Sequence, residues 1–446
     1  MLPKKKDKQQ LGFYSTFEEQ LDHSHSLYIL ANTVDWQKFE IAFAKHYSAT
    51  MGAPAKPIRL MVGLLILKQL RNLSDESVVE QWAENNYYQY FCGEEYFGNQ
   101  QPCVPTELVE FRKRIGQEGF ELILQESIRI NGKDGHGTTL SADTTIQEKN
   151  ITFPTDDKLY KKIIKKCQKI AQEENIDLRQ SYSRTLHKLS ILQRMKHRKK
   201  GEPRARKANR KVKTIAGRLT RELERKLTTD ALQRWGADLQ LFTQVLKQKR
   251  TDSNKIYSLH EPQVHCYSKG KEHKKYEFGS KVSILITQKT GVIVGALNFD
   301  QTIHDSKTLP TVIDQYTRLT NRQAKEVFVD RGYAGPKIIG ETKINMPRPQ
   351  KNITITQRKK HKRRAAIEPC IGHLKQNYRL GRNFLKGSHG DSINVLMAAA
   401  AMNFKRMMNR WKAGSHLFGL FLNQLLSENF FLKERNKIYV ELKMTF

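Results

Sequence analysis

The pattern of hydrophobic and polar positions divides the chain into a helical first part and a mixed second part. Residues from about 11 to 128 lack the strict alternation that is typical of strands. Ile58–Leu67 is apolar on too many sides for a surface helix, so we expect a core helix with Pro57 in its first turn. Ser74 is a suitable N-cap for the helix that follows. The pattern predicts an all-α N-terminal domain over residues 1–130.

The core helix and the helix capped by Ser74 could together form a DNA-binding helix pair, and the charge of the second helix is relevant to this possibility. It carries acidic side chains that would repel phosphate, namely Asp75, Glu76, Glu80 and Glu84. A DNA-reading helix pair therefore stays open beside a plain helical hairpin. We keep DNA-end binding and dimerisation as the two candidate roles of this domain.

From Thr138 onward the pattern changes to that of strands. Thr138–Ile146 is rich in β-branched residues and carries Asp143 near its centre. Further along, a hairpin signal joins two strands, and a helix and another strand follow; the expected ranges are Tyr276–Thr287, Val292–Asn298, Asp305–Leu319 and Glu326–Asp330. This order predicts an α+β domain, a mixed sheet with flanking helices, over residues 138–412. A C-terminal helical tail over 413–446 is expected to follow it.

A basic helical insertion over residues 155–254 interrupts the predicted sheet. Residues 155–250 contain 28 Lys and Arg against 10 Asp and Glu, a net charge of +18 out of +33 for the chain. Lysines of its first helix recur at spacings of three and four, which places them on one face: Lys158, Lys161, Lys162, Lys165 and Lys166. This face predicts phosphate binding, although a solvated basic face has the same pattern. We expect Met195–Lys213 to form a flexible basic hairpin or loop.

Overall composition narrows the class of partner. The 446 residues contain 78 Lys and Arg against 45 Asp and Glu, which favours a polyanion and, by default, double-stranded DNA. Apolar runs fall short of the roughly 20 residues that a membrane span requires, and no secretory signal is visible at the N-terminus. The five cysteines are scattered and form no CxxC pair, which indicates reduced thiols. We expect a cytoplasmic protein that joins the nucleoid when bound to DNA and has no membrane partner.

Three carboxylates are candidates for phosphodiester chemistry. Asp330 follows a buried apolar run and precedes a turn at Gly332. Asp143 lies in the first predicted strand, and Glu368 lies in a basic helix. Carboxylate oxygens suit Mg²⁺, and two such ions can activate an attacking oxygen and stabilise a leaving one. Asp143 and Asp330 would be neighbours if their strands lie side by side. Each carboxylate alone also has a structural explanation, as a turn residue or an ion-pair partner.

Basic residues surround Glu368. Arg364, Glu368 and Lys375 fall on one face of a continuous helix, where the two cations can hold phosphates on either side of the reacting bond. Pro369 must either kink that helix or begin it, and we favour the kink. A basic run just upstream is expected beside the active site, where it would bind DNA; it contains Arg358, Lys359, Lys360, Lys362 and Arg363. Tyr333 can approach the DNA strand or pack in the core.

At these residues the chain resembles bacterial insertion-sequence transposases of the "IS five" group. The motifs are LSADTTIQ, VDRGYAG, RRAAIEPCIGHLK and GDSINVLMAAAAMNFKRMM, and the likeness extends to Leu60–Gly93 and Pro105–Gly116. It implies a ribonuclease H-like core in which Asp143, Asp330 and Glu368 form an Asp-Asp-Glu triad that binds Mg²⁺, for which Mn²⁺ should substitute. By the same likeness, Arg364 and Lys375 match the arginine and lysine of the group's signature around the glutamate. Related transposases have a tyrosine three residues before that arginine, where this chain has His361.

The predicted function is therefore that of a DNA transposase. It would bind the terminal inverted repeats of its element, hydrolyse strands there and join the freed 3′ ends to target DNA. Because two ends must be held together, we expect a homodimer or a larger synaptic assembly. A metal-dependent nuclease of the same fold and a domesticated, non-catalytic DNA-binding protein are the two alternatives.

Overall fold

The computed structural model describes residues 15–48, 50–249, 251–268, 275–347 and 354–414. Its secondary structure is mixed α+β, as predicted from the sequence. The predicted C-terminal tail over 413–446 lies outside the described residues except for its first two positions.

Seven helices form the N-terminal part of the described chain: α1 Phe17–Gln20, α2 Ser26–Thr33, α3 Trp36–Ala44, α4 Ile58–Leu70, α5 Asp75–Glu84, α6 Asn86–Phe91 and α7 Pro105–Ile130. The expected core helix is α4, which is buried over most of its length. Pro57 precedes α4 as its N-cap and does not lie in its first turn. Ser74 caps α5 as predicted, because its side chain accepts a hydrogen bond from the Ser77 N–H.

The sheet is built around one central strand, β1 Thr139–Lys149. On one side of β1 lie the antiparallel strands β3 Tyr276–Thr287 and β4 Ile293–Phe299. On the other side lie β5 Glu326–Phe328 and β7 Thr342–Asn345, each parallel to its neighbour. The order β4-β3-β1-β5-β7, antiparallel on one side of β1 and parallel on the other, is that of a ribonuclease H-like sheet.

Short edge elements complete the sheet and differ from the prediction. The sequence pattern did not predict four short strands, since strands this short have no visible periodicity: β2 His265–Ser268, β6 Ile338–Ile339, β7 and β8 Arg382–Asn383. The predicted strand Glu326–Asp330 ends earlier, at Phe328, and Asp330 lies in the loop that follows it. The predicted helix Asp305–Leu319 is present as α12 Asp305–Thr320, and the side chain of His304 caps it by accepting a hydrogen bond from the Ser306 N–H.

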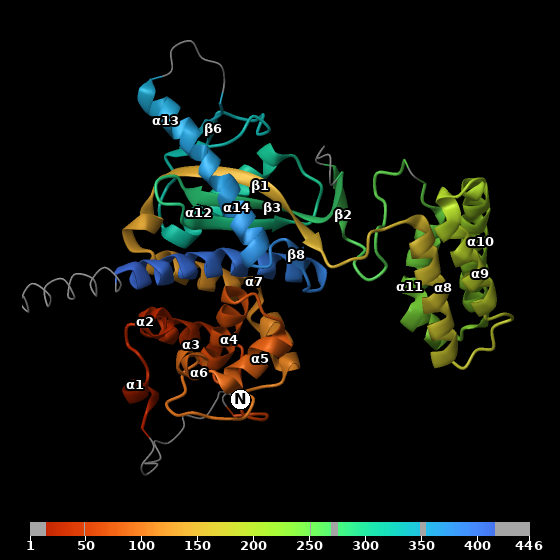
Figure 1. The fold of residues 1–446 in the computed structure, drawn as a ribbon, viewed down its shortest axis with the longest axis horizontal. Coiled ribbons are helices and arrows are strands. Elements are labelled where there is room, and N and C mark those ends of the chain that lie inside the picture. The colour runs from red at the N-terminus through yellow and green to blue at the C-terminus, as the bar shows by residue number, and fades with distance from the viewer. Residues whose placement is uncertain (1–14, 49, 250, 269–274, 348–353, 415–446) are drawn as a thin grey trace, which may run out of the picture.

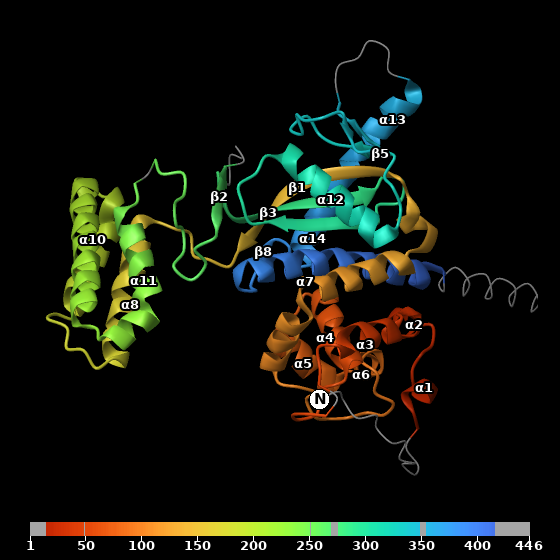
Figure 2. The same cartoon turned by 180° about the vertical axis from the view of Figure 1, so that it is seen from behind.

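Helices cover the sheet and join it to the N-terminal part. Figures 1 and 2 show α12 on one face, and α14 Ile367–Asn377 and the helix over residues 387–414 on the other. Helix α7 and the helix over 387–414 lie between the sheet and the other N-terminal helices. One continuous hydrophobic core extends from α2 to the helix over 387–414, so these parts pack as one unit. The described chain contains no helix that is long and apolar enough to span a membrane.

The insertion is a separate bundle of four helices, α8 Asp156–Glu173, α9 Ser183–Arg194, α10 Gly201–Lys226 and α11 Thr229–Lys247. It stands to one side of the sheet and is joined to it by two chain segments (Figures 1 and 2). The bundle has a hydrophobic core of its own. The expectation of a flexible loop over Met195–Lys213 is wrong, because α10 begins at Gly201. Apolar residues of α10, including Ala208, Val212 and Ile215, pack into the bundle core.

All five cysteines are free thiols, as predicted. Cys92, Cys103, Cys167 and Cys370 are buried, and Cys266 is partly buried. Burial raises the pKa of each of them, so they are protonated at neutral pH and are poor nucleophiles.

Candidate active site

Strand pairing brings the first two candidate carboxylates together. Strands β1 and β5 are parallel neighbours, with Ser141 opposite Phe328. Asp143 lies two residues beyond Ser141, and Asp330 lies two residues beyond Phe328 in the same direction. Both carboxylates therefore lie at the carboxyl end of β5, as expected for neighbouring strands.

The surroundings of Asp143 show how close the candidate residues are. Burial raises the pKa of its carboxyl to about 6. The negative charges of Asp330 and Glu368 add to this rise, whereas the Thr144 N–H, which donates to Oδ1 at 2.8 Å, and the positive charge of Arg364 oppose it. All three carboxylates and Arg364 thus lie within electrostatic range of one another.

Asp330 occupies a turn where one of its oxygens has no partner. Its Oδ1 is buried and accepts no hydrogen bond from the described residues. The predicted turn is present at Arg331 and Gly332. A Cβ atom at position 332 would lie 3.2 Å from this Oδ1, tighter than ordinary contact, so glycine leaves room beside the carboxylate. A buried oxygen without a donor is costly in a stable fold, and a bound cation would satisfy it.

Glu368 faces Arg364 one helical turn away. Oε1 of Glu368 lies 3.2 Å from Nη2 of Arg364, and the Glu368 side chain is 64% exposed. The chain runs from α13 Ile355–Arg363 through the 3₁₀ turn η3 Arg364–Ala366 into α14. The kink that we favoured at Pro369 within a continuous helix is therefore not found: a 3₁₀ turn separates α13 from α14, and α14 begins at Ile367, two residues before the proline. Pro369 sits in the first turn of α14, where its missing N–H leaves no helical hydrogen bond unmade.

Lys375 lies in the last turn of α14. Its Nζ is 4.0 Å from Oε1 of Glu277, a buried residue of β3. This contact was not predicted from the sequence, because Glu277 lies in a strand that was identified only by its apolar pattern. The sequence analysis also did not predict a buried cluster of ion pairs at the end of β1. There Lys149 Nζ lies 2.7 Å from Oδ1 of Asp391 and 3.5 Å from Oε2 of Glu261.

The donor set suits a divalent metal ion, although the carboxylates do not form a closed cage. Among the residues described, no group of three Asp, Glu, His or Cys side chains is gathered tightly enough to hold an ion. Asp143 and Asp330 nevertheless combine mutual repulsion with an unpaired buried oxygen, and both features would be relieved by a cation. Glu368 is the third oxygen donor within electrostatic range, at present paired with Arg364.

The basic run of α13 contacts the sheet and its β3–β4 turn through Lys360 and Arg363. Lys360 forms an ion pair with Glu326 at the start of β5 and lies over the ring of Phe328. Nη2 of Arg363 donates to the Lys289 carbonyl at 3.1 Å. The other members of this run, Arg358, Lys359 and Lys362, are exposed. This part of α13 therefore presents cations to solvent near the end of the sheet where β5 begins.

Two aromatic positions have packing roles. Tyr333 is 2% exposed, so it belongs to the core and does not reach a DNA strand. The ring of His361 contacts the ring of Phe328 edge-on at 5.1 Å between centroids. Burial lowers the pKa of His361, which favours the neutral imidazole.

The lysine face of α8 points away from the bundle core, but most of its members have partners within the chain. Lys161 binds Gln193 and Lys166 pairs with Asp238, whereas Lys158 and Lys162 donate to the Phe153 carbonyl at 3.1 Å and to Thr152 Oγ1 at 3.0 Å. Lys165 is exposed and has no hydrogen bond or ion pair with a described residue.

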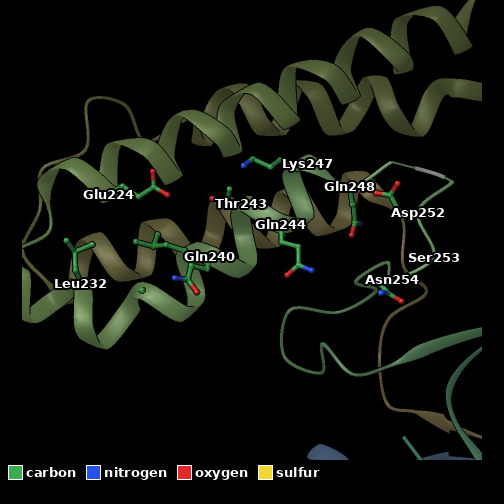
Figure 3. Close-up of a pocket in the computed structure, with 12 residues that line it drawn as sticks. Glu224, Leu232, Gln240, Thr243, Gln244, Lys247, Gln248, Asp252, Ser253 and Asn254 are labelled. Carbon is green, nitrogen blue, oxygen red and sulfur yellow. The ribbon is translucent and has the colours of Figure 1, made fainter. Parts of the chain in front are cut away.

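A cavity of about 910 Å³ lies in the insertion, away from the carboxylates. Figure 3 shows its lining side chains on α11 and on residues 252–254, with Glu224 of α10 at one end. None of the candidate catalytic residues lines it.

Comparisons with known proteins agree with this geometry. The Transposase DDE domain family matches residues 243–404, and the Transposase domain (DUF772) family matches residues 15–114. The chain belongs to the insertion-sequence DDE transposases. The match to the DDE domain includes Asp330 and Glu368 of this transposase but begins after Asp143. The placement of Asp143 in the site therefore rests on the pairing of β1 with β5.

One relative covers part of the transposase. A Rhizobium meliloti protein described as "Uncharacterized protein ORF8 in nfe locus" is 38% identical over 189 residues, which are 40% of this chain and 91% of the relative. No solved structure matches the transposase.

Proposed function

We propose that this transposase binds the terminal inverted repeats of its own element, cleaves DNA strands there and joins the freed 3′ ends to target DNA. The observation that carries the proposal is that Asp143 and Asp330 lie together within electrostatic range of Glu368 on α14 and of Arg364 in η3. Membership in the "IS five" group, the cytoplasmic location and the association with the nucleoid remain predictions from the sequence.

Asp143, Asp330 and Glu368 would hold Mg²⁺, or Mn²⁺ in its place. Bound there, the metal would neutralise charge on the reacting phosphate and help to activate the attacking oxygen. In cleavage, a water oxygen bonds to phosphorus and the bond from phosphorus to the 3′ oxygen breaks, which leaves a 3′ hydroxyl. In joining, that hydroxyl attacks a target phosphodiester and releases a target 3′ hydroxyl. Both steps are phosphoryl transfers, so no nucleotide hydrolysis is required.

Cations around the carboxylates would position the DNA. Arg364 and Lys375 would hold phosphates on either side of the reacting bond, because Arg364 lies in η3 one turn before Glu368 and Lys375 follows Glu368 on α14. Further phosphates would be bound by Arg358, Lys359, Lys360, Lys362 and Arg363 of α13 and by Lys158, Lys161, Lys162, Lys165 and Lys166 of α8. The α8 lysines would have to exchange their present partners for phosphate.

The charge of the N-terminal part favours dimerisation over DNA-end binding as its role. Residues 15–130 contain 16 Asp and Glu against 10 Lys and Arg, a net charge of −6. DNA affinity depends strongly on cations that replace counterions at the phosphates, and this part of the chain has few to offer. We therefore infer that it contacts a second copy of the transposase in the assembly that holds two DNA ends.

The test is cleavage of a duplex that carries the terminal inverted repeat of the element. Asp330→Asn should abolish cleavage in Mg²⁺ and leave affinity for the duplex nearly unchanged, because only the chemical step uses the carboxylate. Asp314→Asn, at an exposed carboxylate of α12, is the matched control and should cleave like the wild type. Full cleavage by Asp330→Asn would rule out the proposed triad. Binding without cleavage by the wild type would indicate a non-catalytic DNA-binding protein.

A further inference from the structure

Helix α10 carries a second basic surface, which differs from the lysine face of α8 in having no internal partners. We name it the α10 ridge; it consists of Lys207, Arg210, Lys211, Arg218, Arg221 and Arg225. At 3.6 residues per turn, these six residues fall within an arc of about 100° on the helix. All six are exposed, and the arc contains no acidic residue.

The six cations have no partners in the described part of the chain. No Asp or Glu oxygen of a described residue lies within ion-pairing distance of any of them, whereas other cations of the same bundle are paired. Arg206 pairs with Glu202, and Lys226 lies 2.9 Å from Glu222, both just outside the arc. Like charges stacked along one helix face repel one another, so the ridge lowers bundle stability unless anions bind to it.

The opposite face of α10 explains why the ridge is exposed. Ala208, Val212, Ile215, Leu219 and Leu223 are buried and pack into the bundle core. This face fixes the rotation of α10, so the cations on the other side form a straight row. The row extends from Lys207 to Arg225, 18 steps of 1.5 Å or about 27 Å along the helix axis.

We propose that the α10 ridge binds the phosphate backbone of duplex DNA, at a distance from the site of cleavage. The proposal rests on the proposed transposase function. Duplex DNA carries one charge per about 1.7 Å of axis, so a row of about 27 Å can follow a groove edge and reach several phosphates. Four of the six residues are arginines, whose planar guanidinium groups bind phosphate through two hydrogen bonds.

The position of α10 separates this role from that of the active site. Both views place α10 on the side of the bundle remote from the sheet, with α8 and α11 between them (Figures 1 and 2). DNA on the ridge is therefore not the segment that contains the reacting phosphodiester. The ridge should contribute to affinity and leave the chemical step unchanged.

The experiment compares two variants of the full-length protein that lose the same charge. The ridge variant combines Lys211→Gln, Arg218→Gln, Arg221→Gln and Arg225→Gln. The control variant combines Lys169→Gln, Arg206→Gln, Lys226→Gln and Arg234→Gln, each at a cation paired with a glutamate of the bundle. Glutamine keeps helix propensity, so both bundles should fold. Affinity for an inverted-repeat duplex is measured across a series of salt concentrations.

Each phosphate contact adds about 0.9 to the slope of log affinity against log salt, so the ridge variant should lose roughly two to four units of slope. The control variant should lose less than about one unit. Single-turnover cleavage with saturating duplex should proceed at the wild-type rate in the ridge variant. A smaller variant, Arg218→Gln with Arg221→Gln, should lose about half as much slope.

Two results would overturn the proposal: a folded ridge variant with the wild-type slope, or equal losses of slope in the ridge and control variants. Either would show that the row of cations is merely solvated. Neither would affect the triad, because cleavage by the wild type and its loss in Asp330→Asn do not depend on the ridge.

Discussion

Asp143→Asn should stabilise the metal-free protein at neutral and alkaline pH while it abolishes cleavage. In the folded protein the pKa of Asp143 is raised from 3.8 to about 6, mainly by burial and further by Asp330 and Glu368. The wild type therefore loses stability as pH rises through about 6, since its carboxyl must ionise in an unfavourable site. The asparagine stays neutral, and its side-chain oxygen can still accept the Thr144 N–H.

The rise in the pKa of Asp143 corresponds to a cost of about 3 kcal/mol at pH 8, and relaxation around the site should reduce this to about 1–3 kcal/mol. About half of that cost should be gone at pH 5, where the folded wild type is largely protonated. Urea unfolding in a chelating buffer at pH 5 and pH 8 measures both values, with Asp314→Asn as the control. Mg²⁺ at pH 8 should stabilise the wild type and have less effect on Asp143→Asn.

A variant no more stable than the wild type at pH 8 would refute the reasoning. So would a stability gain of the same size at pH 5 and pH 8, because a gain that comes from removing an ionised carboxylate must grow with pH.

Three further predictions concern the metal, the cations and the buried polar group. Ca²⁺ in place of Mg²⁺ should support duplex binding with little cleavage, because its looser coordination suits in-line displacement poorly; rapid cleavage in Ca²⁺ would contradict this. Lys375→Ala should slow single-turnover cleavage more than it weakens duplex affinity, whereas equal losses would indicate a general anchoring role. Lys149→Met should lower the free energy of unfolding by about 3–5 kcal/mol near pH 7, since it leaves Asp391 and Glu261 buried without their cation. An unfolding midpoint equal to that of the wild type would show that solvent compensates for the lost lysine.

The sequence predicted those strands and helices whose hydrophobic residues recur with a clear periodicity. It also predicted that Asp143 and Asp330 lie close together. The central strand and the long antiparallel strand were visible from β-branched and apolar patterns, and their ranges agree closely with β1 and β3. The neighbourhood of Asp143 and Asp330 followed once β1 and β5 were taken as adjacent strands, and the parallel pairing confirms it. A conclusion of this kind needs only strand order, which local patterns can suggest.

Other features depend on tertiary structure and could not be foreseen. Strand β8 has two residues and exists because it pairs with the end of β1. The ion pair between Glu368 and Arg364, by contrast, was one of the alternatives that their spacing of four residues indicated, and the structure contains it. The helix that replaces the loop expected at Met195–Lys213 had a readable signal, because its alanines and aliphatic residues recur at helical spacing. We predicted a loop at Met195–Lys213 because of its many charged residues, and gave less weight to the helical spacing of its apolar residues.

Strand transfer is the most direct measurement of the central claim. A duplex carrying the terminal inverted repeat, already cut to expose its 3′ hydroxyl, is incubated with the transposase, Mg²⁺ and a circular target DNA. We predict that wild-type protein joins the labelled 3′ end covalently to the circle, and that Asp143→Asn, Asp330→Asn and Glu368→Gln do not. Cleavage of uncut ends without any joined product would instead make the protein a nuclease, and joining by any of the three variants would contradict the triad.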